Sequence, residues 1–310
     1  MTVLVNMIVT LGMIYVVPAG LRLIDPARFL RTARLWPLAA APGALCLWLP
    51  RGAPAAALAA LYAAACLALA ARAPVRLPRA PSPSTARPAP SEIAVATALV
   101  SPSIAATALV AERAGYRLFG FDLDILALTV PHFHSAGFTA ALVAGLVCRA
   151  VGGRAGTGRL ARWAAYSVPA GTLLVLLGYF VDDWAELLGA VVLTGGMWAV
   201  ALLTWREIRP SGADRTARAL LATSAAVLVA TMLLALWWAA GEATGIPHPT
   251  LTWMAATHGL GNALGFALCS VLAWRRLGAD RPKAGTGTGT ATATGTAIST
   301  GTTDRLETSR

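Results

Sequence analysis

Nine apolar stretches, separated by short Arg-rich connections, constrain this chain more than any other feature. About twenty residues of α-helix, each rising about 1.5 Å, cross the roughly 30 Å of hydrocarbon in a bilayer. The stretches are residues 2–21, 35–50, 52–71, 93–111, 125–148, 163–181, 187–205, 219–241 and 250–274. Only 13% of the residues are charged, against roughly a quarter in soluble domains, which argues against a soluble monomer. The sequence therefore predicts an all-α, polytopic transmembrane bundle.

The basic residues fall almost entirely on one side of this predicted bundle. Segments 22–34, 72–87, 149–162, 206–218 and 275–310 hold 22 of the 25 Lys and Arg residues. Cytoplasmic loops collect Lys and Arg, so the amino terminus is expected outside and the carboxyl terminus in the cytoplasm. The alternation requires all nine stretches to cross, including the second, the weakest, which has 16 residues and two prolines. The net charge of +11 is then explained by insertion into a bacterial cytoplasmic membrane, with the lipid bilayer and not nucleic acid as the partner.

Two segments differ in composition from the bundle, which is expected to occupy residues 1–274. Residues 73–91 are rich in Pro and Arg, which is typical of an extended linker, here on the cytoplasmic side. Residues 275–310 form a tail composed mostly of Gly, Thr and Ala. Because such a tail has few large apolar side chains to bury, we expect it to be disordered.

Polar side chains at membrane depth are the candidates for function, because they are costly to place there. No Asp, Glu, Lys or Arg falls well inside a stretch, which argues against an ion path built on buried carboxylates. The main remaining candidates are His132 and His134 in the fifth stretch, and His258 and Asn262 in the ninth. Asn6 in the first stretch and Ser101 and Ser103 in the fourth complete the set. The acidic residues of the outer connections are interpreted as a solvated face or, alternatively, as a vestibule that attracts cations.

His134 and His258 are expected at the same depth, roughly 13 and 12 Å below the outer ends of their stretches. Each is followed, at helical spacing, by small residues such as Gly137 and Gly261, which let helices approach closely. Both stretches run from outside to inside. We therefore expect the two faces to meet, or both to line one cavity in the outer leaflet.

His132 needs separate treatment, because residues two apart on a regular helix point about 200° from each other. His132 and His134 therefore cannot bind one metal ion unless the helix is distorted. Pro131 could supply that distortion. Alternatively, the two rings face opposite sides and serve two ligands or two neighbouring helices.

Two motifs surround these histidines. The first is Val130-Pro-His-Phe-His-Ser-Ala-Gly-Phe138, and the second is Met254-x-x-x-His258-Gly-x-x-Asn262-Ala-x-Gly-Phe266. Over residues 95–275 the chain resembles the YndJ-like family of bacterial integral membrane proteins, with Ser135 at a position where that family usually has an aromatic residue. The resemblance implies a membrane location and a shared importance of both motifs' histidines and of Asn262. It implies no particular activity, so whether the protein is an enzyme stays open.

Three functions are consistent with the sequence. The first is transport or binding of a small or lipid-like molecule through a cavity lined by His and Asn. The second is a haem or transition-metal protein, including a redox enzyme, with ligation by His134, His258 or His132. His-Phe-His is similar to a segment of haem-copper oxidases, but such an oxidase needs six histidine ligands and this chain has four histidines. The third is a structural or assembly subunit, and the oligomeric state is left open.

Overall fold

The computed structural model describes residues 2–76, 89–212 and 214–279. These residues belong to one unit, and no β-strand occurs among them. The α-helices are α1 (Thr2–Leu11), α2 (Val17–Ile24), α3 (Pro26–Cys46), α4 (Ala53–Ala70), α5 (Pro90–Arg113), α6 (Leu123–His132), α7 (Ala140–Val151), α8 (Thr157–Val181), α9 (Asp183–Leu203), α10 (Arg215–Thr244), α11 (Leu251–Met254) and α12 (Cys269–Ala279). The predicted all-α bundle is confirmed.

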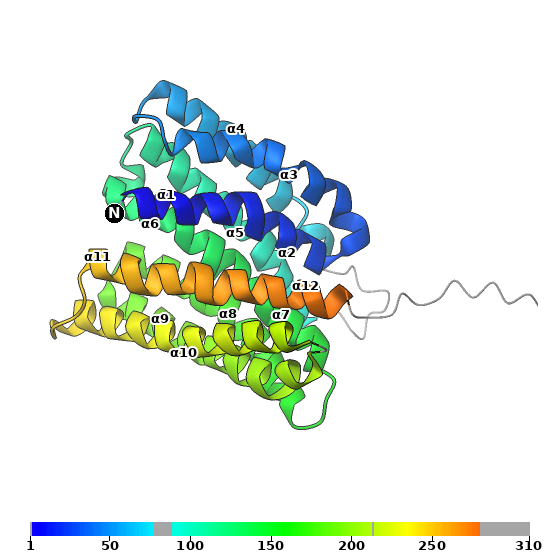
Figure 1. The fold of residues 1–310 in the computed structure, drawn as a ribbon. Coiled ribbons are helices and arrows are strands. Elements are labelled where there is room, and N and C mark those ends of the chain that lie inside the picture. The colour runs from blue at the N-terminus through cyan, green and yellow to red at the C-terminus, as the bar shows by residue number, and fades with distance from the viewer. Residues whose placement is uncertain (1, 77–88, 213, 280–310) are drawn as a thin grey trace, which may run out of the picture. The chain divides into compact units, whose positions relative to one another are not determined.

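Several of these segments join into longer rods through π-helical turns, whose hydrogen bonds span five residues instead of four. The joining turns are Gly12–Val16 (η1), Phe133–Thr139 (η4), Ala255–Gly259 (η7) and Gly261–Leu268 (η8). A further π-helical turn, Thr204–Ile208 (η5), extends α9, and short 3₁₀ turns lie at Pro74–Arg76, Leu118–Gly120 and Arg209–Ser211. In Figure 1 the N-terminus and the start of α11 lie at one end of the unit, and the end of α12 lies at the other.

Eight helical rods in the described ranges are long and apolar enough to cross a membrane. They begin at Val3, Ala53, Pro90, Leu123, Thr157, Asp183, Arg215 and Leu251. The multi-spanning character predicted from the sequence is therefore confirmed. The remaining long helix, α3, has 21 residues but carries three arginines in its first half, which makes it more polar than the others. It packs against α2 and α4 and returns the chain to the other end of the bundle, while its crossing of a membrane as a ninth span stays a prediction.

Several boundaries differ from those predicted. Helix α3 begins at Pro26, well before the predicted stretch 35–50, because Asp25 caps it and accepts a hydrogen bond from the Arg28 amide at 3.1 Å. Helix α5 begins at Pro90, inside the predicted linker, and α12 continues to Ala279. Most of the predicted linker (77–88) and of the predicted tail (280–310) lies outside the described residues.

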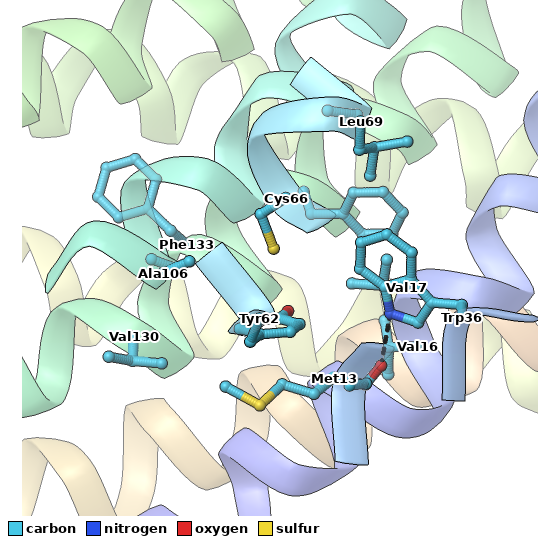
Figure 2. Packing of buried hydrophobic residues seen from close by; sticks show 14 of the residues in the cluster. Met13, Val16, Val17, Trp36, Tyr62, Cys66, Leu69, Ala106, Val130 and Phe133 are labelled. Carbon is cyan, nitrogen blue, oxygen red and sulfur yellow. Dashed lines mark hydrogen bonds between the residues drawn. The ribbon is translucent and has the colours of Figure 1, made fainter. Parts of the chain in front are cut away.

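The interior divides into two hydrophobic clusters. The first is formed mainly by α1 to α6, and the second mainly by α7 to α10 and α12. Figure 2 shows part of the first cluster, where Met13, Trp36 and Tyr62 pack together from three different segments. The indole N–H of Trp36 donates a hydrogen bond to the carbonyl of Met13 at 2.9 Å. Met13 lies in a π-helical turn, where the regular pattern of backbone hydrogen bonds is interrupted. The bond from Trp36 therefore gives the Met13 carbonyl a partner at that point.

Helices α8 and α9 form an antiparallel hairpin whose close packing depends on glycine. A Cβ atom at Gly171 or Gly178 on α8, or at Gly189 on α9, would come within 3.0 Å of backbone atoms of the facing helix. The glycine stripes singled out from the sequence lie on the fifth and ninth stretches. This hairpin shows that glycines also bring two sequential helices to backbone contact.

We predict that Gly189→Ala destabilises the protein by about 1–3 kcal/mol. The added methyl group would meet the backbone of Val175, and no side-chain rotation can relieve that contact. Thermal unfolding in a mild detergent measures the change. Gly195→Ala is the matched control, because on the same helix its Cβ would meet only the ring of Trp163, at 3.1 Å. Equal melting temperatures for the two variants would contradict the proposed packing.

Candidate functional site

A large cavity lies between helices of the two hydrophobic clusters. Its volume is about 920 Å³, and its walls come from α1, α5, α6, α8, α9, α10 and the rod that begins with α11. It extends from the loops that hold Phe119, Asp182 and His248 to the middle of the bundle at Thr172 and Asn262. These loops are the ones predicted to lie outside. The cavity is therefore at the end of the bundle where the sequence predicts one.

Most of the cavity wall is aliphatic or aromatic. A small number of polar groups interrupt it at two levels. Carboxylates gather near the loops, and His132, His258 and Asn262 line the deeper part. A ligand in this cavity would meet charge at the mouth, hydrocarbon along the wall and hydrogen-bonding groups below.

His132 and His134 lie on opposite sides of their helix, which is the second of the two arrangements considered from the sequence. His132 lines the cavity, and its ring nitrogens have no hydrogen-bond partner among the described residues. His134 does not line the cavity and is only 1% exposed. The π-helical turn η4 begins directly after His132, and such turns are frequent at functional sites.

His134 is held in the first hydrophobic cluster by hydrogen bonds at both ring nitrogens. The hydroxyl group of Tyr62 on α4 lies 2.6 Å from Nε2, and the carbonyl of Val130 lies 2.8 Å from Nδ1. A carbonyl can only accept, so Nδ1 carries a proton, and in the neutral ring Nε2 accepts from the hydroxyl group. The rings of Tyr62 and His134 stack with their centroids 6.0 Å apart, and Gly12 on η1 leaves room for the imidazole. His134 is thus a buried residue whose contacts hold helices together.

His258 and Asn262 form a second closed network, with Thr231 on α10. The carbonyl of Thr231 lies 2.8 Å from Nδ1 of His258, so that nitrogen donates. Its Nε2 accepts from the Asn262 amide at 3.0 Å, and Oδ1 of Asn262 accepts from the Thr231 hydroxyl at 2.8 Å. Thr231 was not among the candidates identified from the sequence, although a threonine within an apolar stretch is a recognisable signal. The network joins two helices and also forms part of the cavity wall.

The expected meeting of the Gly137 and Gly261 faces is wrong. Gly137 packs against Ser101 on α5, whereas Gly261 packs against Thr231 and Val227 on α10. The turns η4 and η8 are in contact, but through other positions. The physical reason is that a π-helical turn holds more residues than an α-helical one, so a face projected with regular helical spacing is displaced. The alternative expectation, that both stretches line one cavity, holds for His258 and Asn262. In the fifth stretch, however, His132 lines the cavity and His134 does not.

The metal or haem alternative stays a prediction. No group of three His, Cys, Asp or Glu side chains that could hold a metal ion occurs among the described residues. The ring nitrogens of His134 and His258 are all engaged in hydrogen bonds, and only His258 lines the cavity. His132 offers a ring without such bonds, but one imidazole does not make a metal site.

We predict that Tyr62→Phe destabilises the protein by about 1–2 kcal/mol, because Nε2 of His134 loses its donor in a buried site. Denaturant unfolding in detergent measures this change. Tyr166→Phe is the control, since that ring is 44% exposed on the bundle surface. An unfolding curve for Tyr62→Phe that overlays that of the control would contradict a structural role for His134.

Comparison with known proteins identifies the family. The family model described as YndJ-like protein matches residues 7–266, which is most of the chain and includes both histidine motifs and nearly all of the residues that line the cavity. No curated protein and no solved structure matches the chain. The match extends the resemblance noted over residues 95–275 almost to the amino terminus. This multi-spanning chain therefore belongs to the YndJ-like family.

Proposed function

We propose that the protein binds a small or lipid-like molecule in this cavity, as the first step of its transport from the outer leaflet of a bacterial cytoplasmic membrane. The observation that carries the proposal is the cavity of about 920 Å³ with apolar walls and a few polar groups. Ligand sites in proteins typically have volumes of about 300–1,000 Å³ and this same mixture of groups. The concentration of Lys and Arg in alternate connections supports the assignment of the cavity mouth to the outer side.

Apolar surface that faces water is costly for a folded protein, by about 25 cal/mol for each Å². The α8–α9 hairpin shows that this chain can pack helices to backbone contact. The walls of the cavity, in contrast, stay apart. A hydrocarbon-bearing ligand would supply the missing contacts.

His132 supports the binding of a ligand that also has a polar group. His134 and His258 each belong to a separate structural network, so their ring nitrogens are already occupied. His132 lies on the cavity wall without such a partner among the described residues. An unpaired polar group at membrane depth is unfavourable, and a hydrogen bond from the ligand would remove that cost.

We predict that Ala235→Phe abolishes ligand binding, because Ala235 on α10 lines the cavity and a phenyl group would fill part of it. The full chain in phosphatidylcholine nanodiscs is titrated with diphenylhexatriene, a rod-shaped apolar fluorophore. Saturable energy transfer from tryptophan to the probe reports binding, and Trp238 lies in the cavity wall.

Ala240→Phe is the matched control, because Ala240 is also a half-buried residue of α10 but does not line the cavity. The wild type and this control are expected to show saturable transfer, whereas Ala235→Phe shows only the linear signal of probe dissolved in lipid. Absence of a saturable component in the wild type, or its persistence in Ala235→Phe, would refute the proposed site.

A further inference from the structure

Four acidic side chains gather at the mouth of the cavity. Asp182, Asp183, Glu186 and Glu242 all belong to the wall. Among the described residues, no Lys or Arg lines the cavity, although the chain as a whole has a net charge of +11. The local charge is therefore opposite in sign to the net charge of the protein.

Two of these carboxylates have partners that explain their presence. Asp182 caps α9 and accepts a hydrogen bond from the Ala185 amide at 2.7 Å. Glu242 lies 3.1 Å from Nε2 of His248, which is in the same wall. Neither explanation extends to Asp183 and Glu186.

Glu186 is the decisive residue, because it is only 7% exposed and still faces the cavity. The hydroxyl group of Tyr179 lies near its carboxyl group, and no basic side chain pairs with it among the described residues. Asp183 and Glu242 are close enough to act on it electrostatically, and both are acidic. Like charges gathered at a poorly solvated site are relieved by a bound cation.

Aromatic rings lie in the same part of the wall. Phe121 contacts both Tyr179 and Phe180, with ring centroids 6.3 and 5.3 Å apart, and Trp238 lies beside His248 at 6.4 Å. All of these residues line the cavity. The faces of aromatic rings attract ammonium groups, and the attraction is strongest where water is excluded.

We propose that the ligand of this cavity is a cationic amphiphile, whose ammonium group lies against Glu186 and Asp183 at the mouth and whose hydrocarbon part extends along the apolar wall. The proposal rests on the function proposed above and names the chemical class of its ligand. A metal ion fits less well, because the described residues contain no group of three suitable ligands. An anionic phospholipid headgroup would be repelled by the same carboxylates.

Three probes that share the diphenylhexatriene rod test the charge preference. One is unsubstituted, one carries a trimethylammonium group and one carries a propionate group. Each is titrated into phosphatidylcholine nanodiscs that hold the full chain, with affinities expressed per lipid to correct for partitioning. We expect the cationic probe to bind at least about tenfold more tightly than the neutral one, and the anionic probe to bind least.

Variants then assign the preference to the mouth. Glu186→Gln keeps a hydrogen-bonding group beside Tyr179 but removes the charge, and is expected to bring the ratio of cationic to neutral affinity to within about threefold. Asp183→Asn tests the same charge at an exposed position, where the substitution leaves the packing intact. Asp122→Asn is the control, because this acid lies at the same end of the bundle but pairs with Arg117 and does not line the cavity.

The outcomes separate this inference from the proposed function. If the cationic and neutral probes bind equally well, the cavity binds apolar molecules and the cationic class is wrong. An unchanged ratio in both Glu186→Gln and Asp183→Asn would also overturn it. If no probe binds saturably, the function proposed for the cavity fails as well.

Discussion

Hydrocarbon offers no hydrogen bonds, so each polar group at membrane depth must find its partner inside the protein, and this constraint governs the interior of the bundle. His134 meets it through Tyr62 and Val130, and His258 meets it through Thr231 and Asn262. The first network joins helices that are separated in sequence, and the second joins α10 to the rod that follows it. The polar groups therefore help to determine which helices are neighbours, while the surrounding apolar side chains fill the space.

The π-helical turns are part of the same arrangement. Three of them carry His134, His258 and Asn262. In η1 the carbonyl of Met13 accepts from Trp36, and in η4 the carbonyl of His134 accepts from the Thr139 hydroxyl at 3.1 Å. Widened turns interrupt the regular pattern of backbone hydrogen bonds, and side chains of the bundle donate hydrogen bonds to carbonyls in these turns.

These turns also separate what the sequence could predict from what it could not. Whether a chain crosses a membrane several times depends on the length of its apolar stretches, and that length can be read from the local composition. The direction of a side chain depends on the helical period, and a π-helical turn shifts it for the residues beyond. Of the polar residues expected inside the bundle, His132, His258 and Asn262 line the cavity, whereas His134 does not. Contacts between distant helices, such as that of Tyr62 with His134, have no counterpart in local sequence.

The position of the cavity between helices of two clusters has a consequence for the transport proposed here. The clusters are separated at the mouth, whereas near the far end the side chain of Trp274 packs against both. A ligand that enters at the mouth thus meets a bundle that is closed below the level of Asn262. Release on the opposite side would require the clusters to part around Trp274, and the bond between His258 and the Thr231 carbonyl would keep α10 and the last rod together during that movement. His132 lies outside that network and has no such bond among the described residues. Its ring can therefore keep a hydrogen bond to the ligand while these helices move.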